Sequence, residues 1–501
     1  MSKSELEKLR TGIAGLDQIA RGGLPKGRAT LVSGTAGSAK TVLASQYLAE
    51  GIIQFQESGI FATFEESPED IRRNMSGFNW DIAKWESQNL WRFVDLSPSE
   101  EGDDYGITGD FDFGGVISRL KHAIEQTKAT RVVLDSVNAV FTRFENEGII
   151  RRELFRLARE LKKMQVTTMV TTERISDYGE TSKHGVEEFV ADNVILLRNV
   201  LEHENRRRTL EILKFRGTEH QKGESPFTIV PKLGLALLPL SSRELTQKSS
   251  SRRISSGIKS LDQLCGGGFF QDSVILVSGA TGTGKSLLTT HFVSGGAPEE
   301  RSLLLGFEES SDQMLRNAQG WGMDFQPMID AGRLKIICTY PESASLEDHL
   351  FIVQEAIEEF KPTRVAVDSL SALSRVSGDK SFRDFVLGLS SFLKEREIAG
   401  LFTSATASLL GGQSVTETHI STITDSIILL RYVEMFGEML RGITVLKMRG
   451  SHHEKEICRF DVDSSGMHIA KAFKNITGIL AGTPSYVDNK EVERIKGLFD
   501  E

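Results

Sequence analysis

The amino-acid sequence predicts an α/β protein made of two similar domains, each a mostly parallel sheet flanked by helices. At 501 residues the chain is too long for a single hydrophobic core. Its second half repeats motifs of its first half, and short apolar runs alternate with helix-length segments throughout. With 39% hydrophobic and 26% charged residues, the composition is that of an ordinary globular protein.

The repeat is visible in five blocks that recur in the same order, 233 to 245 positions later. A repeat of this length indicates a duplicated domain rather than a solenoid unit. The paired blocks are TGIAGLDQIARGG (11–23) with SGIKSLDQLCGGG (256–268), LVSGTAGSAKT (31–41) with LVSGATGTGKS (276–286), FEES (64–67) with FEES (307–310), VVLDSV (132–137) with VAVDSL (365–370), and LKFRG (213–217) with LKMRG (446–450). Segment 241–256 is rich in Ser and Arg and is the expected linker. We therefore expect domains at 1–245 and 246–484 and a short tail at 485–501.

Short apolar runs give the expected strands. Their length and composition fit strands that are buried on both faces of a parallel sheet. Helix-length segments such as Glu153–Lys163 and Leu287–Val293 lie between such runs. The runs are Ala29–Ser33, Ile60–Phe64, Arg131–Leu134, Val166–Thr171 and Val194–Leu197 in the first half and Val274–Ser278 in the second.

Charge and cysteine content limit the function classes. Sixty Lys and Arg against 69 Asp and Glu give a net charge of −9, so no overall positive field recruits nucleic acid or an anionic membrane, although a local basic groove stays open. Cys265, Cys338 and Cys458 lie far apart without CxxC spacing, which indicates a reducing compartment and argues against a zinc site. No apolar run has the length of a signal peptide core or of a membrane span. We therefore expect a cytoplasmic protein.

Residues 279–286 form a complete phosphate-binding loop, GxxxxGK[ST], between an expected strand and an expected helix. In such a loop the glycines let backbone N–H groups surround the phosphates, Lys285 supplies charge to the β- and γ-phosphates, and the Ser286 hydroxyl can bind Mg²⁺. The residues expected to contact ATP here are Thr281, Gly282, Thr283, Gly284, Lys285, Ser286 and Leu287.

The first half carries a variant of this loop in which Ala39 replaces the last glycine. A negative φ at this position would cost little, whereas a positive φ would strain the alanine. Because Lys40 and Thr41 are intact, we expect this half to bind ATP as well, with Thr41 at the Mg²⁺ ion. Its candidate ATP contacts are Gly34, Thr35, Ala36, Gly37, Ser38, Ala39, Lys40 and Thr41.

Acidic residues follow two expected strands in each half. Asp135 and Asp368 end apolar runs, where a carboxylate can orient Mg²⁺ or its waters; a helix N-cap is the alternative role. The pairs Glu65-Glu66 and Glu308-Glu309 follow the second strand of each half, so they should project near the γ-phosphate. Their recurrence after Phe favours a general base over a merely solvated acidic pair, and Glu308 is also a candidate metal ligand.

Each half also has a late basic pair, Lys214 and Arg216 or Lys447 and Arg449. Residues two apart on a strand share a face, so both cations could reach one phosphate. They come too late in the chain to be assigned to the loop of their own domain. Contact with the nucleotide of a neighbouring subunit and a solvated basic face both stay open.

These residues resemble the KaiC family of circadian clock proteins, which are tandem RecA-like ATPases. The resemblance runs from Thr11 to about Pro484 and is carried by GATGTGKS, the two FEES blocks, WGMDF (321–325), YPESASLEDHL (340–350), HISTITD (419–425) and KMRGSHHEK (447–455). It implies a two-tiered homohexamer with ATP at the subunit interfaces. It further implies a slow ATPase in the first ring and autokinase and autophosphatase activity in the second.

The resemblance also implies roles for individual residues. Ser421 and Thr422 match the phosphoacceptor pair, Thr416 an auxiliary threonine, Glu308 the residue that takes the hydroxyl proton, and Trp321 the residue beside adenine. Contacts across the subunit interface are implied for Arg441, Lys447, Met448, Arg449, Ser451, His453 and Lys455 in the second half and for Lys214, Phe215, Arg216, Thr218 and His220 in the first. At an offset of 233, Ser421 and Thr422 correspond to Glu188 and Phe189, so only the second half carries acceptor hydroxyls.

The expected cofactors are ATP and Mg²⁺, and the expected partners are further copies of the chain and a KaiB-like protein. The tail after Pro484 resembles the start of the family's regulatory segment but stops early, which argues against a KaiA-type activator and for intrinsic kinase activity. No membrane or nucleic-acid partner is expected. Two other functions stay open, a RecA-like DNA-dependent ATPase and a nucleotide-gated signalling scaffold without kinase activity.

Overall fold

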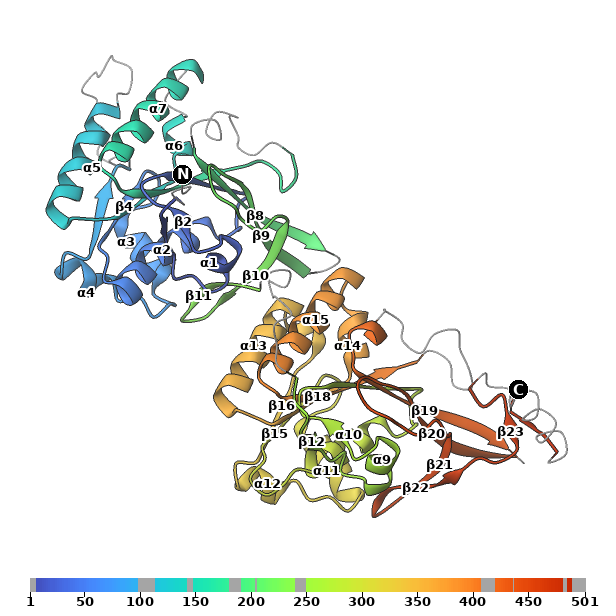
Figure 1. Ribbon diagram of the computed structural model, residues 1–501. Helices are drawn as coiled ribbons and strands as arrows, with labels where there is room; N and C mark the ends of the chain where they lie inside the picture. Colours follow the sequence, from blue (N-terminus) through green and yellow to red (C-terminus); the bar gives the residue numbers. More distant parts are fainter. Residues whose placement is uncertain are drawn as a thin grey trace. The chain divides into compact units, whose positions relative to one another are not determined.

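The computed structural model describes residues 6–97, 113–141, 147–179, 191–202, 205–238, 249–406, 420–435, 437–480 and 484–488. The chain forms two compact units, Met1–Glu244 and Leu245–Glu501, which run from blue to green and from green to red in Figure 1. Each unit is built around one sheet of nine strands.

The sheet of the first unit is parallel over its first six strands and antiparallel over its last three. The strands lie in the order β5 (Trp91–Asp95), β4 (Gly59–Thr63), β6 (Arg131–Asp135), β7 (Thr167–Glu173), β3 (Ala29–Gly34), β8 (Asn193–Glu202), β9 (Asn205–Phe215), β10 (Glu224–Val230) and β11 (Gly234–Leu237). Strands β5 to β8 run parallel, and β9 to β11 are antiparallel to their neighbours. The five strands expected in this half are therefore confirmed, with β8 extended because it continues as a long hairpin with β9.

The second unit has the same strand order, which confirms the duplication. Its strands are β16 (Leu334–Cys338), β15 (Ser302–Gly306), β17 (Arg364–Asp368), β18 (Ala399–Ala405), β14 (Val274–Gly279), β19 (Ser426–Met435), β20 (Glu438–Met448), β21 (Cys458–Asp463) and β22 (Gly466–Ala472). Two-stranded pairs accompany the large sheets: β1 (Lys8–Leu9) with β2 (Leu24–Pro25), β12 (Arg253–Ile254) with β13 (Phe269–Phe270), and β23 (Ile476–Thr477) with β24 (Ser485–Tyr486).

Helices cover both faces of each sheet, as strands buried on both faces require. The first unit contains α1 (Leu16–Ile19), α2 (Lys40–Phe55), α3 (Pro68–Met75), α4 (Ile82–Ser87), α5 (Phe113–Thr127), α6 (Asn138–Phe141) and α7 (Glu147–Lys163). The second contains α9 (Lys259–Leu264), α10 (Lys285–Ser294), α11 (Ser311–Gly320), α12 (Gln326–Asp330), α13 (Leu346–Phe360), α14 (Leu370–Arg375) and α15 (Asp379–Glu395), with the 3₁₀ turns η2 (Pro341–Ser343) and η3 (Ile420–Thr422). Helices α5 and α7 lie side by side in the first unit, and α13 and α15 do so in the second (Figure 1).

Alternate side chains of the strands enter different cores. In the first unit Phe61 and Val133 pack in one cluster with residues of α1 to α4, whereas Ile60 and Val132 pack in another with residues of α5 and α7. No described helix has the length and apolar content needed to cross a bilayer. Cys265 and Cys458 are buried and Cys338 is half-buried.

Each unit buries one arginine at the start of an equivalent strand. Arg131 begins β6 and donates to Glu57 over 2.7 Å, and Arg364 begins β17 and donates to Glu300 over 3.0 Å. Both partners are buried in the Arg364–Glu300 pair, and removing one of them costs about 3–5 kcal/mol because the other charge is left uncompensated, whereas Glu57 is partly exposed. The two pairs therefore anchor the strands that end in the candidate metal-binding aspartates.

The expected linker is too long at its C-terminal end. Residues 241–248 lie outside the described part of the chain, but Arg253–Ile254 forms β12 and pairs with β13. The backbone N–H of Ser250 donates to Asp272 over 2.9 Å. Segment 249–256 therefore belongs to the second unit, where its backbone forms hydrogen bonds despite its polar composition.

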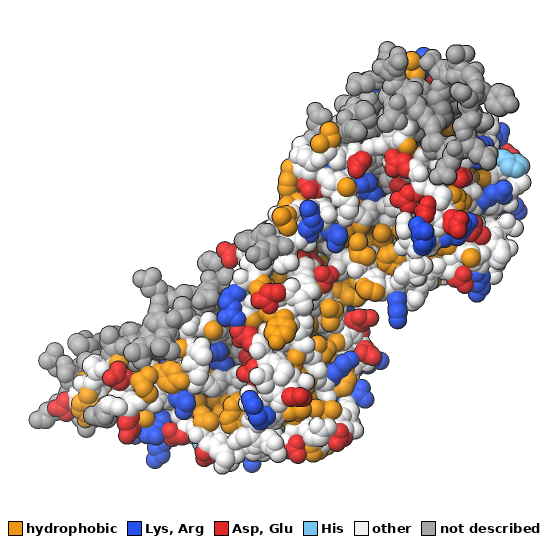
Figure 2. All heavy atoms as spheres, turned by 180° about the vertical axis from the view of Figure 1, so that it is seen from behind, with side chains coloured by type: hydrophobic (Ala, Val, Ile, Leu, Met, Phe, Trp, Pro, Cys, Tyr) orange, Lys and Arg blue, Asp and Glu red, His pale blue; other side chains and the backbone are white. Residues whose placement is uncertain are grey.

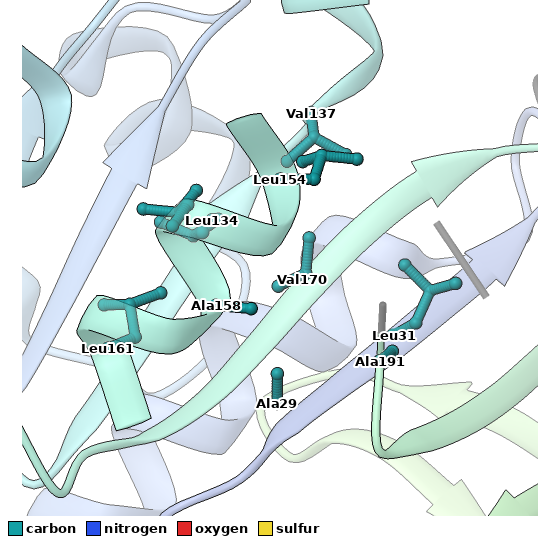
Figure 3. A pocket seen from close by; sticks show the side chains of 10 residues that line it. Ala29, Leu31, Leu134, Val137, Leu154, Ala158, Leu161, Val170 and Ala191 are labelled. Carbon is teal, nitrogen blue, oxygen red and sulfur yellow. The ribbon is translucent and has the colours of Figure 1, made fainter. Parts of the chain in front are cut away.

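An apolar cavity of about 40 Å³ lies under α7 in the first unit (Figure 3). Its lining comes from α7 and from strands β3, β6 and β7, and Val170 of β7 is among the lining residues. Val170 pairs with Leu31, and the equivalent pair in the second unit is Phe402 with Leu276. Phe402 is wholly buried, so the larger ring occupies the position where the first unit has a valine and a cavity.

We expect the substitution Val170→Phe to stabilise the first unit by about 1 kcal/mol, because the ring would fill apolar space that is otherwise empty. Denaturant unfolding measures this change when it is followed by the fluorescence of Trp80, Trp85 and Trp91, and Trp321 reports the unfolding of the second unit. The reverse substitution Phe402→Val is the matched control and should cost about 2 kcal/mol. A loss of stability in Val170→Phe would contradict the prediction and indicate overpacking.

Candidate functional site

The phosphate-binding loop of the second unit connects β14 to α10. The Lys285 ammonium group donates to the carbonyl oxygens of Gly279 and Ala280, both over 2.8 Å, and the Thr283 hydroxyl donates to Ala280 over 2.7 Å. Burial lowers the pKa of Lys285, while Asp368 and Glu308 act in the opposite direction. The cation is therefore held within the loop, with carboxylates close enough to influence its charge.

The loop of the first unit has the same internal bonds. Lys40 donates to Gly34 over 3.0 Å and to Thr35 over 2.9 Å, and the Ser38 hydroxyl donates to Thr35 over 2.7 Å. A further contact, which the sequence does not reveal, runs from the Thr35 hydroxyl to Asp177 over 2.9 Å. The acidic residue lies 142 positions away, and only the folded chain brings it to the loop.

The structure shows that Ala39 has a positive φ, which the sequence alone could not decide. Its φ is +72°, and the equivalent Gly284 has a φ of +104°. A non-glycine residue in this left-handed region costs about 1–2 kcal/mol. The first loop therefore keeps the glycine-type path and carries the strain of an alanine.

Both loops are suited to phosphate binding. Within the described chain, no side chain caps the start of α2 or of α10, so backbone N–H groups of the first turn are available to an anion. The hydrogen bonds of each loop lysine in the described structure go to backbone carbonyl oxygens. Phosphate oxygens would satisfy both kinds of donor, so the residues present fit the triphosphate of ATP.

The two aspartates bind threonines of the neighbouring strand. Asp135 accepts a hydrogen bond from Thr171 and another from Thr41 of the phosphate loop, and burial raises its pKa. Asp368 accepts one from Thr403 over 2.6 Å. The N-cap residue of α14 is Ser369, so Asp368 does not have the capping role that was its alternative. Hydroxyl and carboxylate oxygens are suitable Mg²⁺ ligands, and the first unit brings Thr41 and Asp135 into contact.

The members of each glutamate pair have different partners. Glu65 accepts from the Ser136 hydroxyl over 3.2 Å, and Glu308 accepts from the Ser369 hydroxyl over 3.1 Å. The first glutamate of each pair therefore points to the end of the aspartate-bearing strand. Burial raises the pKa of Glu65, with Asp135 and Glu173 adding to the rise, and this makes its carboxylate a better proton acceptor.

The second glutamate of each pair is held by an asparagine of the following helix. Asn74 of α3 donates to Glu66 over 3.1 Å, and Asn317 of α11 donates to Glu309 over 2.9 Å. In the second unit alone, among the described residues, an arginine joins the site, because Arg375 at the end of α14 forms an ion pair with Glu308. A hollow of about 160 Å³ lies beside Glu308 and Glu309 and leaves room for a reactant.

The late basic pairs lie at the other edge of the sheet. Lys447 is near the end of β20, where Met448 is paired with Ser426 of β19, and Ser426 is paired with Ile275 at the start of β14. The phosphate loop leaves the opposite end of β14, roughly 13 Å farther along the strand. In the first unit, Phe215 is paired with Asn193 and Asn193 with Thr30, so Lys214 and Arg216 have the same placement.

The second basic pair binds the backbone of the expected acceptor segment. Lys447 donates to the carbonyl oxygens of Ser421 over 2.8 Å and Thr424 over 2.6 Å, and Arg449 donates to that of Thr422 over 3.0 Å. The Ser421 side chain is half-buried and that of Thr422 is exposed, both within η3. Thr416 lies outside the described residues. The structure thus brings the backbone of the expected acceptors to Lys447 and Arg449 and separates it from the phosphate loop of the same unit.

Hollows accompany the basic pairs at this edge. One of about 260 Å³ in the first unit is lined by Arg28, Asp192 and Arg216 among others. One of about 490 Å³ in the second unit is lined by Lys394, Asp425 and Arg449 among others. Since Asp192 and Arg216 correspond to Asp425 and Arg449, both units have a hollow lined by an arginine and an aspartate at the same place, and Asp272 adds a second carboxylate in the second unit.

Arg441 is separated from the other residues expected at the subunit interface. It is paired with Tyr432 of β19, and the Tyr432 hydroxyl lies 2.7 Å from the place of a Cβ on Gly282 of the phosphate loop. Six residues of strand, roughly 20 Å, separate Arg441 from Lys447. Arg441 therefore lies at the edge that carries its own phosphate loop.

The remaining expected contacts are placed as follows. Phe215 and Met448 belong to the cores, so only their backbone is accessible to a ligand. His220 packs against Phe215, and burial lowers its pKa. Trp321 ends α11, half-buried against the second core. Ser451 accepts from Arg253 over 2.5 Å, Thr218 and His453 are half-buried, and Lys455 is exposed.

The face drawn in Figure 2 carries Lys and Arg side chains interspersed with Asp and Glu, with hydrophobic side chains between them. This pattern agrees with the nearly balanced charge of the sequence. Long-range attraction of a polyanion needs cations gathered on one surface, and the drawn face has both signs of charge mixed.

Comparisons with known proteins identify relatives over the whole chain. A family model described as the KaiC ATPase matches residues 9–242 and again 254–474. Circadian clock protein KaiC3 of Synechocystis sp. is 60% identical over 497 residues, which cover 99% of this chain and 98% of that protein. Circadian clock oscillator protein KaiC of Thermosynechococcus vestitus is 52% identical over 504 residues, covering 100% of this chain and 96% of the relative. The protein of the same name from Synechococcus elongatus is 51% identical over 494 residues, covering 98% and 95%.

Exchanging the residues at the last position of the two loops should have unequal effects. Gly284→Ala should destabilise the second unit by about 1–2 kcal/mol and weaken ATP binding there, because its φ of +104° is farther from the region an alanine tolerates. Ala39→Gly should stabilise the first unit by up to about 1 kcal/mol, because relief of about 1–2 kcal/mol of strain outweighs the greater freedom of glycine in the unfolded chain. Denaturant unfolding and nucleotide titration measure both effects, and equal losses in the two variants would contradict this account.

Proposed function

The chain belongs to the KaiC family of ATPases, and on this premise we propose that it is an ATP-dependent serine/threonine autokinase and autophosphatase in addition to an ATPase. The names of its relatives support a role in a circadian or other timing system. ATP binds at both phosphate loops. The first unit hydrolyses it, and the second transfers its γ-phosphate to Ser421 or Thr422 of a neighbouring copy of the chain.

The observation that carries this proposal is the position of the acceptor segment. Lys447 and Arg449 hold its backbone at the edge of the sheet opposite to the phosphate loop. Within one unit the acceptor hydroxyls and the bound γ-phosphate would lie at opposite edges. When a neighbouring copy presents its acceptor edge to the loop edge, the same two cations arrive beside the transferred phosphate, where positive charge stabilises the transition state.

In the proposed reaction the hydroxyl oxygen of Ser421 or Thr422 attacks the γ-phosphorus. The new P–O bond forms as the bond from the γ-phosphorus to the bridging oxygen breaks, and the electron pair leaves with ADP. The hydroxyl proton passes to Glu308. Lys285 offsets the charge on the phosphates. Ser286 and Asp368 would hold Mg²⁺ there, as Thr41 and Asp135 would in the first unit, and the ion supplies further positive charge.

Self-assembly follows from an active site that needs two copies, and we propose a homohexamer with two tiers. Exposed leucines on equivalent strands support such contacts, since Leu213 is 46% and Leu446 is 36% exposed directly beside Lys214 and Lys447. A KaiB-like protein is the proposed further partner, on the basis of the relatives' clock function.

The double substitution Ser421→Ala with Thr422→Ala should abolish labelling of the protein by ATP radiolabelled at the γ-phosphate. ATP hydrolysis in the first unit should persist, because its site contains neither residue. Mass spectrometry of the labelled protein locates the phosphate, and Ser464→Ala, an exposed serine in the turn between β21 and β22, is the control. Full labelling of the double variant would overturn the kinase assignment. Hydrolysis with no labelling of the unsubstituted protein would favour the scaffold alternative.

Transfer between subunits can be tested by mixing two inactive variants. Glu308→Gln alone and Lys447→Ala alone should each lower labelling by at least about tenfold. Co-expressed, they should recover about a quarter of the original labelling, because one in four neighbouring pairs in a random ring joins an intact Glu308 to an intact Lys447.

In that experiment the label should appear on the Glu308→Gln subunits, which keep an intact acceptor edge, and a size tag on one variant separates the two chains. No recovery, or label confined to the other subunits, would contradict transfer between neighbours.

A further inference from the structure

At one strand end beside its phosphate loop, the first unit has a carboxylate where the second unit has a methyl group. Glu173 is the last residue of β7 and is paired with Gly34, the first residue of the phosphate loop. The equivalent pair in the second unit is Ala405 with Gly279. At this strand end, next to the loop, the first site therefore has an acidic side chain where the second site has an alanine.

The Glu173 side chain is exposed and faces the reacting side of the site. Side chains two apart on a strand share a face, and Thr171, two residues earlier, binds Asp135. Among the groups that favour the charged form of Lys40, Glu173 comes first, followed by Asp135 and Glu65. Glu173 thus lies among the lysine, the aspartate and the glutamate that are expected to surround the γ-phosphate.

Hydrogen bonds fix the strand end that carries Glu173. Its carbonyl oxygen accepts from Asn138 over 3.5 Å, and Asn138 in turn accepts from the Thr172 hydroxyl over 2.6 Å. The next backbone N–H, of Arg174, donates to Gly34 over 3.2 Å. The carboxylate is therefore attached to a rigid part of the sheet, as a group that orients a reactant must be.

Hydrolysis and transfer to a protein hydroxyl need different numbers of hydrogen-bond acceptors around the attacking oxygen. An attacking water has two O–H groups, and both must be held if its lone pair is to point at phosphorus. A serine or threonine hydroxyl has one O–H group, and its second substituent is a carbon atom that needs space and no acceptor. Two carboxylates suit the water, whereas one carboxylate beside a small residue suits the alcohol.

We propose that Glu173 is a specificity-determining residue, which together with Glu65 holds the attacking water and makes the first site a hydrolase, while Ala405 leaves the second site open to an alcohol. This inference rests on the proposed function. In the hydrolytic step the water oxygen bonds to the γ-phosphorus, and the bond from phosphorus to the bridging oxygen breaks with its electron pair leaving on ADP. One water proton passes to Glu65. The other remains on the new phosphate oxygen, directed at Glu173.

The first test measures hydrolysis by the full chain carrying Glu308→Gln, which leaves the first site as the source of inorganic phosphate. Glu173→Gln should lower kcat by about 10- to 100-fold with KM changed less than twofold, and Glu173→Asp should restore part of the rate. Glu69→Gln, an exposed glutamate on α3, is the matched control and should have no effect. An unchanged kcat in Glu173→Gln would overturn the proposal.

The second test uses the other unit and does not depend on how the Glu173 variants fold. In a chain carrying Glu65→Gln, Ala405→Glu should increase the release of inorganic phosphate from the second site several-fold and decrease labelling of Ser421 and Thr422. Ala405→Gln has nearly the same size without the charge and should not increase hydrolysis. If Ala405→Glu leaves the ratio of released inorganic phosphate to labelled protein unchanged, the proposal is also overturned.

A further variant separates this inference from the proposed function. Lys40→Ala in the Glu308→Gln chain should abolish hydrolysis. If hydrolysis persists there, the first site is not the hydrolytic one and the proposed function itself fails. If hydrolysis depends on Lys40 but not on Glu173, only the specificity role fails.

Discussion

The direction of the parallel strands is the constraint on which the rest of the structure depends. In each unit six strands end at the same edge, so residues that are far apart in the sequence meet there: the phosphate loop after β3 or β14, the glutamates after β4 or β15, and the aspartate that ends β6 or β17. The antiparallel hairpin that follows returns the chain to the other edge and places the basic pair there, which in the second unit is beside the segment that precedes β19. One sheet therefore separates the phosphate loop of a unit from its basic pair and, in the second unit, from Ser421 and Thr422.

Because the chain contains two copies of this arrangement, equivalent residues of the two sites can be compared directly. The hydroxyl-to-glutamate bonds, the asparagine supports and the buried arginine pairs are the same in both units. Glu173 against Ala405 and Ala39 against Gly284 are differences at the site itself. Under the proposed function, these few substitutions in one scaffold would favour different nucleophiles, since the fold supplies positions and the side chains at the edge supply the chemistry.

Much of the fold and of the candidate site could be predicted from the sequence, and there are physical reasons why the rest could not. Buried strands and phosphate loops are local patterns, so their existence was predictable, with errors of a few residues at the ends. The φ of Ala39 depends on the path of the chain on both sides of the loop and is not encoded in the residue. Contacts such as Thr35 with Asp177 join residues that only the tertiary fold brings together. The separation of Arg441 from Lys447 was predictable in principle, because six residues of strand span too great a length for both to reach one phosphate of one nucleotide.

If phosphate is transferred between neighbouring copies as proposed, the opposite placement of donor and acceptor also determines how many complete active centres an assembly contains. A row of n subunits joined edge to edge contains n − 1 complete centres. The phosphate loop at one end has no acceptor segment beside it, and the acceptor segment at the other end has no phosphate loop. Joining the two ends removes both defects, so that every copy donates once and accepts once. Only a closed ring thus has one complete active centre per chain. A filament or an open ring of the same subunits would have an incomplete site at each end.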